Sequence, residues 1–241
     1  MKKLLLDIES APNIGYSWGK WEQNIIQFIE NWYIICVGYK WYGEKTKVIF
    51  SKGKDDKALC KELFALLDEA DVVITQNGDS FDLRKINTRF LIHGIPPPSP
   101  FATVDTLKIA RSRFSFNSNK LDDMGNDLDE GRKIKHRGIE LWLDCMARKP
   151  QALKEMGKYN VQDVELLERV YKRFLPWVKH HPNSSNIDEV SGCPTCGSRE
   201  LQKRGFRYTQ TQKYQQLSCK QCKSWSYIPL DTKRDFKPIK N

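Results

Sequence analysis

Short apolar runs and amphipathic stretches alternate along most of the chain. The first run, LLLDIES at residues 4–10, is typical of a buried strand, but its second half contains two acidic side chains. Two β-branched and aromatic runs, at residues 33–43 and 46–51, predict a pair of strands with a glycine turn between them. DVVITQN at residues 71–77 predicts a further strand. Together these runs predict a sheet.

Helical spacing occurs between and after these strands. Residues 55–70 carry leucine and phenylalanine at intervals of three and four, which predicts an amphipathic helix. A second helix is expected over 80–94, where Gly94 and the following IPPPSP end it. Residues 151–178 show the clearest helical pattern. Its apolar stripe consists of Met156, Val164, Leu167, Val170 and Phe174. Strands that alternate with helices predict a mixed α/β domain over residues 1–178.

The composition of the chain changes after this domain. Residues 179–192 are polar and contain Pro, Ser and Asn, which predicts a linker. A small second module is expected over 193–230, followed by a basic tail over 231–241. The whole chain has a net charge of +10, and residues 191–241, with 11 Lys and Arg against 3 Asp and Glu, carry +8 of it. This excess favours a polyanionic partner at the C-terminal module.

Neither an export signal nor a membrane span is predicted. The opening MKKLLLD is similar to the start of a signal peptide, but Asp7 interrupts its apolar run. Signal peptides need roughly 7–15 apolar residues, and membrane helices need about 20. An intracellular, cytoplasmic location is therefore expected, where thiols stay reduced.

The acidic residues of the first strand, Asp7 and Glu9, are two positions apart. Side chains alternate between the faces of a strand, so both carboxylates point the same way. Buried carboxylates repel each other unless a cation lies between them, and Mg²⁺ or Mn²⁺ prefers such oxygen ligands. The alternative is a strand that ends at residue 6 and leaves two solvated acids.

Two later segments carry acidic residues in contexts that strengthen the metal interpretation. Asp82 follows a strand and a turn of small residues, at the start of a helix, where an aspartate ordinarily caps the helix. Tyr159 and Asp163 are four residues apart on the long C-terminal helix, and hence on one face. Asp163 lies close to the apolar stripe of that helix rather than on its opposite surface.

In this order, the segments DIE, NGDSFD and Tyr-x-x-x-Asp resemble the three motifs of the DEDDy branch of the DnaQ-like 3′–5′ exonucleases. The resemblance covers residues 1–178 and is greatest to the exonucleases predicted in phages and bacteria. It implies a ribonuclease H-like mixed sheet flanked by helices and two-metal phosphodiester hydrolysis. The implied ligands of two Mg²⁺ or Mn²⁺ ions are Asp7, Glu9, Asp82 and Asp163, and Tyr159 is implied to orient the attacking water.

Three further residues lie near these motifs. Asp79 is an alternative to Asp82, but the family motif usually ends in Phe-Asp, which favours Asp82. Asp105 is interpreted as a turn former. His136 matches no motif position, because the branch with a histidine places it a few residues before the last aspartate, where this chain has Tyr159.

The C-terminal module contains two C-x₂-C pairs with 22 residues between them. Zn²⁺ binds four thiolates in a tetrahedron, and each short C-x₂-C turn presents two. The usual separation of such pairs is about 15–20 residues, so we expect a zinc ribbon whose insert forms a hairpin. Disulfides in a secreted module are the alternative, which the missing signal peptide disfavours. The predicted zinc ligands are Cys193, Cys196, Cys219 and Cys222.

The ribbon resembles those of transposases and similar DNA-binding proteins in its Cys-Pro-x-Cys-Gly start and in the aromatic and basic segment that follows. Basic side chains neutralise phosphates, and aromatic side chains stack on unpaired bases. The alternative is that the aromatics form a small core and the lysines are merely solvated. The predicted nucleic-acid contacts are Lys203, Arg204, Arg207, Lys213, Lys220 and Lys223.

These features predict a two-metal 3′–5′ exonuclease that releases nucleoside 5′-monophosphates, with single-stranded DNA favoured over RNA as substrate. An exoribonuclease of the same chemistry and a catalytically silent binding or recruitment protein are the alternatives. A structure-selective endonuclease is disfavoured by the Tyr159 pattern. Replication or repair proteins are left open as partners. The aromatic-rich residues 16–42 are expected to serve the core rather than substrate stacking.

Overall fold

The computed structural model describes residues 1–21, 24–184 and 192–230. The chain divides into two compact units, Lys2–Val170 and Tyr171–Asn241, the latter with Met1. The predicted domain borders stay predictions, and the predicted basic tail and part of the predicted linker, residues 185–191, lie outside the described residues. Among the described helices, none combines the length and the apolar character that crossing a lipid bilayer requires.

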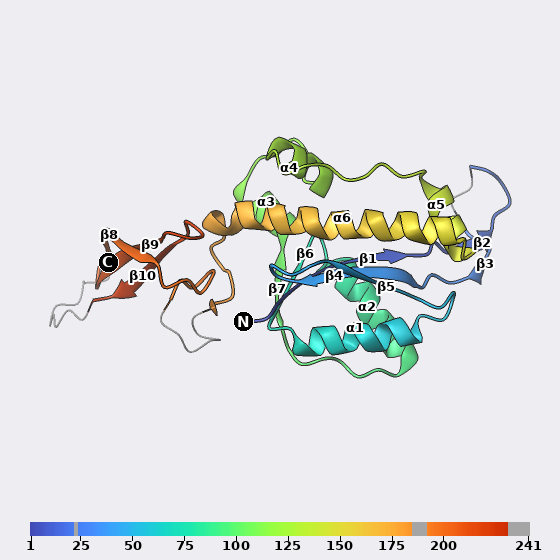
Figure 1. Ribbon diagram of the computed structural model, residues 1–241, viewed down its shortest axis with the longest axis horizontal. Coiled ribbons are helices and arrows are strands. Elements are labelled where there is room, and N and C mark those ends of the chain that lie inside the picture. Colours follow the sequence, from blue (N-terminus) through green and yellow to red (C-terminus); the bar gives the residue numbers. More distant parts are fainter. Residues whose placement is uncertain (22–23, 185–191, 231–241) are drawn as a thin grey trace. The chain divides into compact units, whose positions relative to one another are not determined.

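A mixed five-stranded sheet forms the centre of the larger unit, in the order β5-β4-β1-β6-β7 (Figure 1). Strands β1 (Lys3–Ser10), β4 (Ile34–Trp41) and β5 (Lys47–Phe50) are antiparallel neighbours. Strands β6 (Val72–Thr75) and β7 (Ala102–Asp105) run parallel to β1. The sheet confirms the predicted α/β class.

Helices cover both faces of this sheet (Figure 1). Helices α1 (Lys57–Glu69) and α2 (Asp82–His93) pack on one face, and α5 (Ile139–Met146) and α6 (Pro150–Phe174) pack on the other. The shorter helical segments are α3 (Thr106–Arg113), α4 (Leu121–Asp127) and the 3-10 turn η1 (Leu175–Trp177). Periodicity predicted α1, α2 and α6 correctly to within a few residues.

Alternation along β1 explains where its acidic side chains point. Leu4, Leu6 and Ile8 belong to the apolar cluster formed with α1 and α2. Because neighbouring side chains of a strand point to opposite faces, Asp7 and Glu9 face α6 instead. The apolar stripe predicted for α6 is buried throughout, as expected for a helix packed on a sheet.

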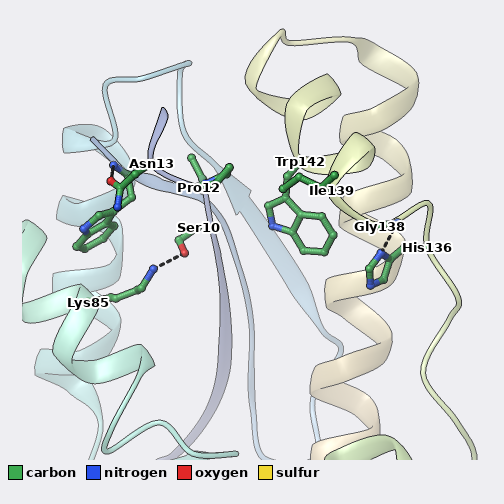
Figure 2. A pocket seen from close by; sticks show the side chains of 10 residues that line it. Ser10, Pro12, Asn13, Lys85, His136, Gly138, Ile139 and Trp142 are labelled. Atoms are coloured by element: carbon green, nitrogen blue, oxygen red, sulfur yellow. Dashed lines mark hydrogen bonds between the residues drawn. The ribbon is translucent and has the colours of Figure 1, made fainter. Parts of the chain in front are cut away.

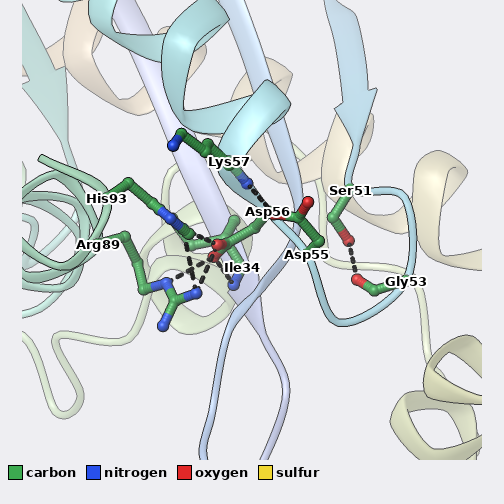
Figure 3. Close-up of polar contacts among 8 residues, drawn as sticks. All are labelled: Ile34, Ser51, Gly53, Asp55, Asp56, Lys57, Arg89 and His93. Atoms are coloured by element: carbon green, nitrogen blue, oxygen red, sulfur yellow. Dashed lines mark hydrogen bonds and ion pairs between the residues drawn. The ribbon is translucent and has the colours of Figure 1, made fainter. Parts of the chain in front are cut away.

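A buried ion cluster ties α1 and α2 to β4 (Figure 3). The fully buried Asp56 accepts hydrogen bonds from the backbone N–H of Ile34 at 2.9 Å and from Arg89 at 2.8 and 2.6 Å. Nε2 of His93 lies 2.6 Å from Asp56 Oδ1. Burial would raise the pKa of Asp56, but the hydrogen bonds from Arg89, Ile34 and His93 outweigh it and hold that pKa below its ordinary value. Asp56 is therefore ionised and hydrogen-bonded at neutral pH.

A separate two-stranded sheet follows β1. Strands β2 (Ile14–Tyr16) and β3 (Gln27–Glu30) pair with each other in antiparallel fashion. Between them, Trp18 and Trp21 are 84% and 87% exposed. The prediction that this aromatic-rich segment serves the core is therefore wrong for these two residues, although Trp32 does pack against the core. Strands β2 and β3 join no buried face, so neither helical nor strand periodicity revealed them.

Three antiparallel strands form the sheet of the smaller unit, in the order β10-β9-β8. Strands β8 (Leu201–Tyr208) and β9 (Lys213–Cys219) form a hairpin, and β10 (Trp225–Pro229) pairs with β9. The hairpin lies between the two cysteine pairs, which confirms the predicted conformation of the insert.

Candidate functional site

The carboxyl ends of the parallel strands meet at one edge of the larger sheet, and the predicted acidic residues lie at that edge. Asp7 and Glu9 belong to the second half of β1. Asp82 is the first residue of α2, which follows β6, and Asp105 is the last residue of β7. This edge is where open sheets with parallel strands commonly bind their ligands.

Three of the predicted carboxylates converge at this edge. Oxygen atoms of Asp7, Glu9 and Asp163 lie within 4.8 Å of one another. Asp163 comes from α6, so the first strand and the last long helix of the unit build the cluster together. Like charges at this separation repel strongly when water is largely excluded.

The turn before α2 positions Asp82. Asn77 adopts a left-handed backbone (φ 63°), and a Cβ at position 78 would lie 2.2 Å from Thr75 Oγ1, so the turn requires Gly78. Asp82 Oδ1 then accepts a hydrogen bond from the backbone N–H of Ile8 at 3.0 Å. Since β1 pairs with β6 only along its first residues, Asp82 satisfies a donor that β6 leaves open.

Asp79, the alternative in this segment, makes a different contact. Its Oδ2 accepts a hydrogen bond from Lys108 Nζ at 2.6 Å. Asp82, by contrast, accepts a hydrogen bond from the backbone N–H of Ile8, the residue after Asp7, and its charge helps to raise the pKa of Asp7. Asp105 accepts a hydrogen bond from the first turn of α3 and caps that helix, which confirms its interpretation as a turn former.

Burial and mutual repulsion raise the pKa values of the acidic side chains. Burial raises the pKa of Glu9 to about 8, with further repulsion from Asp163. Burial likewise raises the pKa of Asp82 to about 6, and burial followed by repulsion from Asp82 raises the pKa of Asp7 well above its ordinary value. The protein groups alone thus supply too little positive charge for this site, and a divalent cation would supply it.

The donor atoms fit such a cation. Asp163 Oδ1 is buried, and no described residue donates a hydrogen bond to it. An unsatisfied buried carboxylate oxygen is unfavourable, unless a ligand binds it. The converging donors are all carboxylate oxygens, which suit Mg²⁺ or Mn²⁺ rather than softer metals. Asp7, Glu9 and Asp163 therefore have the chemistry of a hard-metal site.

Lys133 adds a positive charge that no sequence motif indicated. It lies in the loop before α5, forms an ion pair with Asp163, and its Nζ lies 3.4 Å from the hydroxyl of Tyr159. Burial would lower the pKa of Lys133, but the charges of Asp163 and Asp7 outweigh it and raise that pKa. The lysine is therefore protonated beside the carboxylates.

Asn160 connects the two elements that carry the acids. Its Nδ2 donates hydrogen bonds to Asp7 Oδ2 at 2.8 Å and to the Asp7 carbonyl at 3.2 Å. A Cβ at Gly38 on β4 would lie 2.6 Å from Asn160 Oδ1, so glycine lets α6 approach the sheet this closely. Asn160 precedes Asp163 by three residues and shares its helical face, a signal from which the residue could have been found.

Aromatic side chains surround Tyr159 beside the acids. Its ring centroid lies 5.1 Å from that of His136 and 6.4 Å from that of Trp142, and its hydroxyl accepts a hydrogen bond from Lys133. Burial, and then the charge of Asp163, raises the pKa of Tyr159, so its hydroxyl stays neutral. The motifs indicated neither His136 nor Trp142 as part of the site.

A pocket of about 410 Å³ lies beside the acidic residues of β1. Ser10, the residue that follows Glu9, is part of its lining. Figure 2 shows Lys85 of α2 and Trp142 of α5 on opposite sides of it. Lys85 donates a hydrogen bond to Ser10 Oγ at 2.6 Å, and its Nζ lies 4.5 Å from the ring centroid of Trp32, which also lines the pocket. Two indoles and a cation suit a nucleobase and its phosphate.

The four predicted zinc ligands lie together in the smaller unit, with their sulfur atoms within 4.8 Å of one another. The Cys193 and Cys222 sulfurs are 3.6 Å apart, and those of Cys196 and Cys219 are 3.7 Å apart. A disulfide needs about 2.05 Å, whereas thiolates on a tetrahedral zinc, with Zn–S bonds of about 2.3 Å, are about 3.8 Å apart. The spacing fits a structural zinc ion rather than disulfides.

The hairpin of the ribbon presents aromatic and basic side chains to solvent. Lys213 lies 3.8 Å from the ring centroid of Phe206, and Arg207 lies 5.0 Å from that of Tyr227. Phe206 and Tyr227 are exposed, which disagrees with the alternative that such residues form a core. Of the basic residues predicted to contact nucleic acid, Lys213 is half-buried and the others are exposed: Lys203, Arg204, Arg207, Lys220 and Lys223.

A comparison with protein families matches residues 29–175, more than half of the chain, to the RNase_H superfamily. The chain belongs to this superfamily. The match to the RNase_H superfamily includes the second and third motif segments but begins after β1, so Asp7 and Glu9 lie outside it. Proteins of the RNase_H superfamily are typically metal-dependent phosphodiester hydrolases, which indicates a nucleic-acid-processing nuclease as the general class.

Among solved structures, the family B DNA polymerase from the hyperthermophilic archaeon Pyrobaculum calidifontis is similar to this RNase_H superfamily member, with a TM-score of 0.57 and 16% sequence identity. The similarity covers 73% of this chain and 25% of the polymerase chain. At this identity the likeness shows the fold alone, and it confirms the predicted ribonuclease H-like architecture. No curated protein matches the sequence.

Proposed function

We propose that this chain is a metal-dependent 3′–5′ exonuclease that releases nucleoside 5′-monophosphates from single-stranded DNA. The convergence of Asp7, Glu9 and Asp163 within 4.8 Å, with Asp82 beside them, is the observation that carries the proposal. Such a set of oxygen donors suits the two-metal chemistry by which phosphodiesters are hydrolysed. The resemblance of the three motifs to the DEDDy exonucleases supports the direction of cleavage.

The four carboxylates would hold two Mg²⁺ or Mn²⁺ ions, which when bound supply a water of lowered pKa and stabilise the leaving oxygen. The chain itself holds these carboxylates in place before any substrate arrives. Asn160 fixes Asp7 through a hydrogen bond of 2.8 Å, and the backbone N–H of Ile8 fixes Asp82. Such preorganisation lowers the reorganisation that the reaction requires.

Tyr159 and Lys133 complete the proposed site. The raised pKa of Tyr159 keeps its hydroxyl protonated, so it orients the attacking water through a hydrogen bond rather than acting as a base. The ammonium group of Lys133, 3.4 Å from that hydroxyl, attracts the negatively charged phosphate and offsets part of the acidic charge.

The pocket beside Glu9 supports an unpaired nucleotide as the group that is released. Trp32 and Trp142 both line it. The side-chain nitrogen of Lys85 lies over the ring of Trp32 and donates a hydrogen bond to Ser10. A base that is still stacked in a duplex cannot use these aromatic faces. Single-stranded ends are therefore the favoured substrate.

We assign the zinc ribbon a binding role. Four thiolates complete the coordination of zinc, which leaves no open position for catalysis. The exposed cations of the ribbon are suited to contact phosphates, and the neighbouring aromatic rings are suited to contact bases. The proposed contacts are Lys203, Arg204, Arg207, Lys213, Lys220 and Lys223.

Digestion of 3′- and 5′-labelled single-stranded DNA and RNA, with Mg²⁺, Mn²⁺ or EDTA, tests the proposal. We expect metal-dependent release of mononucleotides from the 3′ end, abolished by Asp7→Ala and by Asp163→Ala. Glu62→Ala is the matched control, because Glu62 is an exposed acidic residue of α1 outside the acidic cluster. Asp82→Ala compared with Asp79→Ala decides which aspartate serves the second motif.

Other outcomes identify the alternatives. Undiminished cleavage by both Asp7→Ala and Asp163→Ala would overturn the proposed site. Faster digestion of RNA than of DNA would indicate an exoribonuclease. Cleavage of circular single-stranded DNA would reveal endonuclease activity, and binding of either polymer without any cleavage would indicate a recruitment protein.

A further inference from the structure

The β2–β3 sheet and its connecting residues, here called the arm (residues 14–21 and 24–30), expose an unusual amount of apolar surface for a soluble protein. Contiguous exposed patches of this kind commonly mark interaction sites. The large apolar side chains that the arm exposes include Tyr16, Trp18, Trp21, Ile26, Phe28 and Ile29.

The arm has a defined fold but no sheet partner. Its two strands pair only with each other among the described strands, and an isolated pair of strands is marginal in water. A Cβ at Gly15 would lie 2.5 Å from Ile25 Cγ2 and 3.5 Å from the ring of Phe28, so these two side chains close over the glycine. The arm is therefore shaped by its own contacts while its outer surface stays uncovered.

The arm begins and ends at the pocket beside the acidic cluster. Asn13, which Figure 2 labels, precedes β2, and Trp32 follows β3; both residues line that pocket. The backbone N–H of Trp32 donates to Asn13 Oδ1 at 2.8 Å and closes the base of the arm. A continuous segment thus connects the pocket to Trp18 and Trp21.

Lysines accompany the aromatic rings at both ends of this segment. In the pocket, Lys85 lies 4.5 Å from the ring centroid of Trp32 and 4.7 Å from that of Phe81. On the arm, Lys20 lies 5.4 Å from the ring centroid of Trp21. A ring that stacks on a base beside a cation that pairs with a phosphate is the chemistry of single-strand binding.

We propose that the arm binds unpaired bases of the substrate strand, several nucleotides away from the terminal nucleotide in the pocket. The inference rests on the proposed function, because it extends the same substrate path. The ligand is single-stranded nucleic acid of any sequence, since every base offers a face for stacking. A protein partner and a second copy of this chain are the competing occupants.

The test compares the full-length protein with the variant Trp18→Ala/Trp21→Ala. Fluorescence anisotropy in a buffer without Mg²⁺, Mn²⁺ or chelator, which leaves the ribbon zinc in place, measures the Kd for labelled oligothymidylates of about 15 nucleotides and for a trinucleotide. We expect the double variant to weaken binding of the longer strand by about tenfold or more, because two stacking contacts are lost. Binding of the trinucleotide, which reaches the pocket alone, should not change.

Leu91→Ala is the matched control, because Leu91 is an exposed apolar side chain on α2 outside the arm and the pocket. It should bind both oligonucleotides as the wild type does. Photo-crosslinking adds a direct readout: iodouridine at interior positions of the longer strand should label arm peptides that contain Trp18 or Trp21.

Cleavage of the trinucleotide with Mn²⁺ separates this inference from the proposed function. If the wild type cleaves it and the double variant binds the longer strand unchanged, the arm proposal is wrong and the proposed function stands. If the wild type cleaves neither substrate, the proposed function is wrong, and the titration without Mg²⁺ or Mn²⁺ still decides for or against the arm. A dimer that the double variant converts to a monomer, with unchanged oligonucleotide affinity, would assign the arm to self-association instead.

Discussion

Asn160 on α6 donates a hydrogen bond of 2.8 Å to the carboxylate of Asp7 on β1. The bond joins the strand that carries Glu9 to the helix that carries Tyr159 and Asp163. Leaving a buried polar group without its hydrogen-bond partner costs ~1–3 kcal/mol, so this bond helps to fix the spacing of the acidic cluster. We therefore consider Asn160 a positioning residue of the site, although the motif resemblance assigned it no role.

Replacement of Asn160 should impair the site without unfolding the protein. Mutation of a residue that orients metal ligands typically lowers metal affinity or activity by about 10–100-fold. We expect a loss of this size for Asn160→Ala, both in Mn²⁺ affinity and in kcat/KM. Isothermal titration with Mn²⁺ and digestion of labelled DNA measure the two effects. Lys154→Ala is the control, because Lys154 is an exposed residue of the same helix outside the site. Unchanged Mn²⁺ affinity in Asn160→Ala would contradict the assignment.

Gly38 on β4 should tolerate no side chain. A Cβ there would lie 2.6 Å from Asn160 Oδ1 and 3.0 Å from the Asn160 carbonyl, so Gly38→Ala must push α6 away from the sheet. Overpacking of this kind costs ~1–3 kcal/mol in the free energy of unfolding, which urea titration measures. Gly19→Ala, whose Cβ would meet no atom within 4 Å, should change it by less than about 0.5 kcal/mol. Equal stabilities of the two variants would contradict the prediction.

The parts of the site that follow a regular period could be predicted from the sequence. Strand alternation predicted that Asp7 and Glu9 point to the same face of the sheet, and helical spacing predicted that Asp163 lies beside the apolar stripe of α6. The elements β1, α2 and α6 are long and strongly patterned, so their existence was predicted correctly. Their convergence came from the motif resemblance rather than from periodicity, which carries no information on long-range contacts.

The remaining parts depend on contacts that no local pattern encodes. Lys133 lies in an irregular loop, where neither alternation nor helical spacing determines the direction of a side chain. The arm was missed because prediction from composition assigns aromatic runs to a core, whereas Trp18 and Trp21 are exposed. His136 contacts Tyr159 only because the loop returns to α6, which the sequence does not indicate.

The buried cluster around Asp56 should make the stability of the larger unit sensitive to acid. The folded-state pKa of Asp56 is lower than the value of about 3.9 for an aspartate in an unfolded chain. Its contribution is therefore fully present above that value and is lost as the pH falls through the lower, folded-state pKa. At pH 7, Asp56→Asn leaves the buried Arg89 without its anion and should lower the free energy of unfolding by ~3–5 kcal/mol.

Urea unfolding of Asp56→Asn and wild type at several pH values measures this difference, which should shrink under acid conditions. Asp55→Asn is the matched control, because Asp55 is exposed and caps the Lys57 backbone, a role that asparagine also performs (Figure 3). A difference between Asp56→Asn and wild type that is constant from pH 7 down to acid pH would contradict the role of the Asp56 charge.

Zinc should be required for the fold of the ribbon and dispensable for that of the larger unit. Within the described part of the ribbon, the buried apolar side chains are Leu217, Cys193 and Cys219, which is too small a core for independent stability. Metal binding supplies the missing folding free energy in such modules. Cys219→Ser should therefore lose the zinc measured by mass spectrometry and make the ribbon sensitive to protease.

Because residues 2–170 form their own compact unit, Cys219→Ser should keep the thermal unfolding transition of that unit and its cleavage of short oligonucleotides. Affinity for longer strands should fall, since the cations of the ribbon would no longer be held on one surface. Ser218→Ala, which alters the neighbouring residue of β9 but no thiolate, is the control. A Cys219→Ser protein with a protease-resistant ribbon would mean that the β-strands hold it together without the metal. A loss of both units would mean that the larger one depends on the ribbon for its stability.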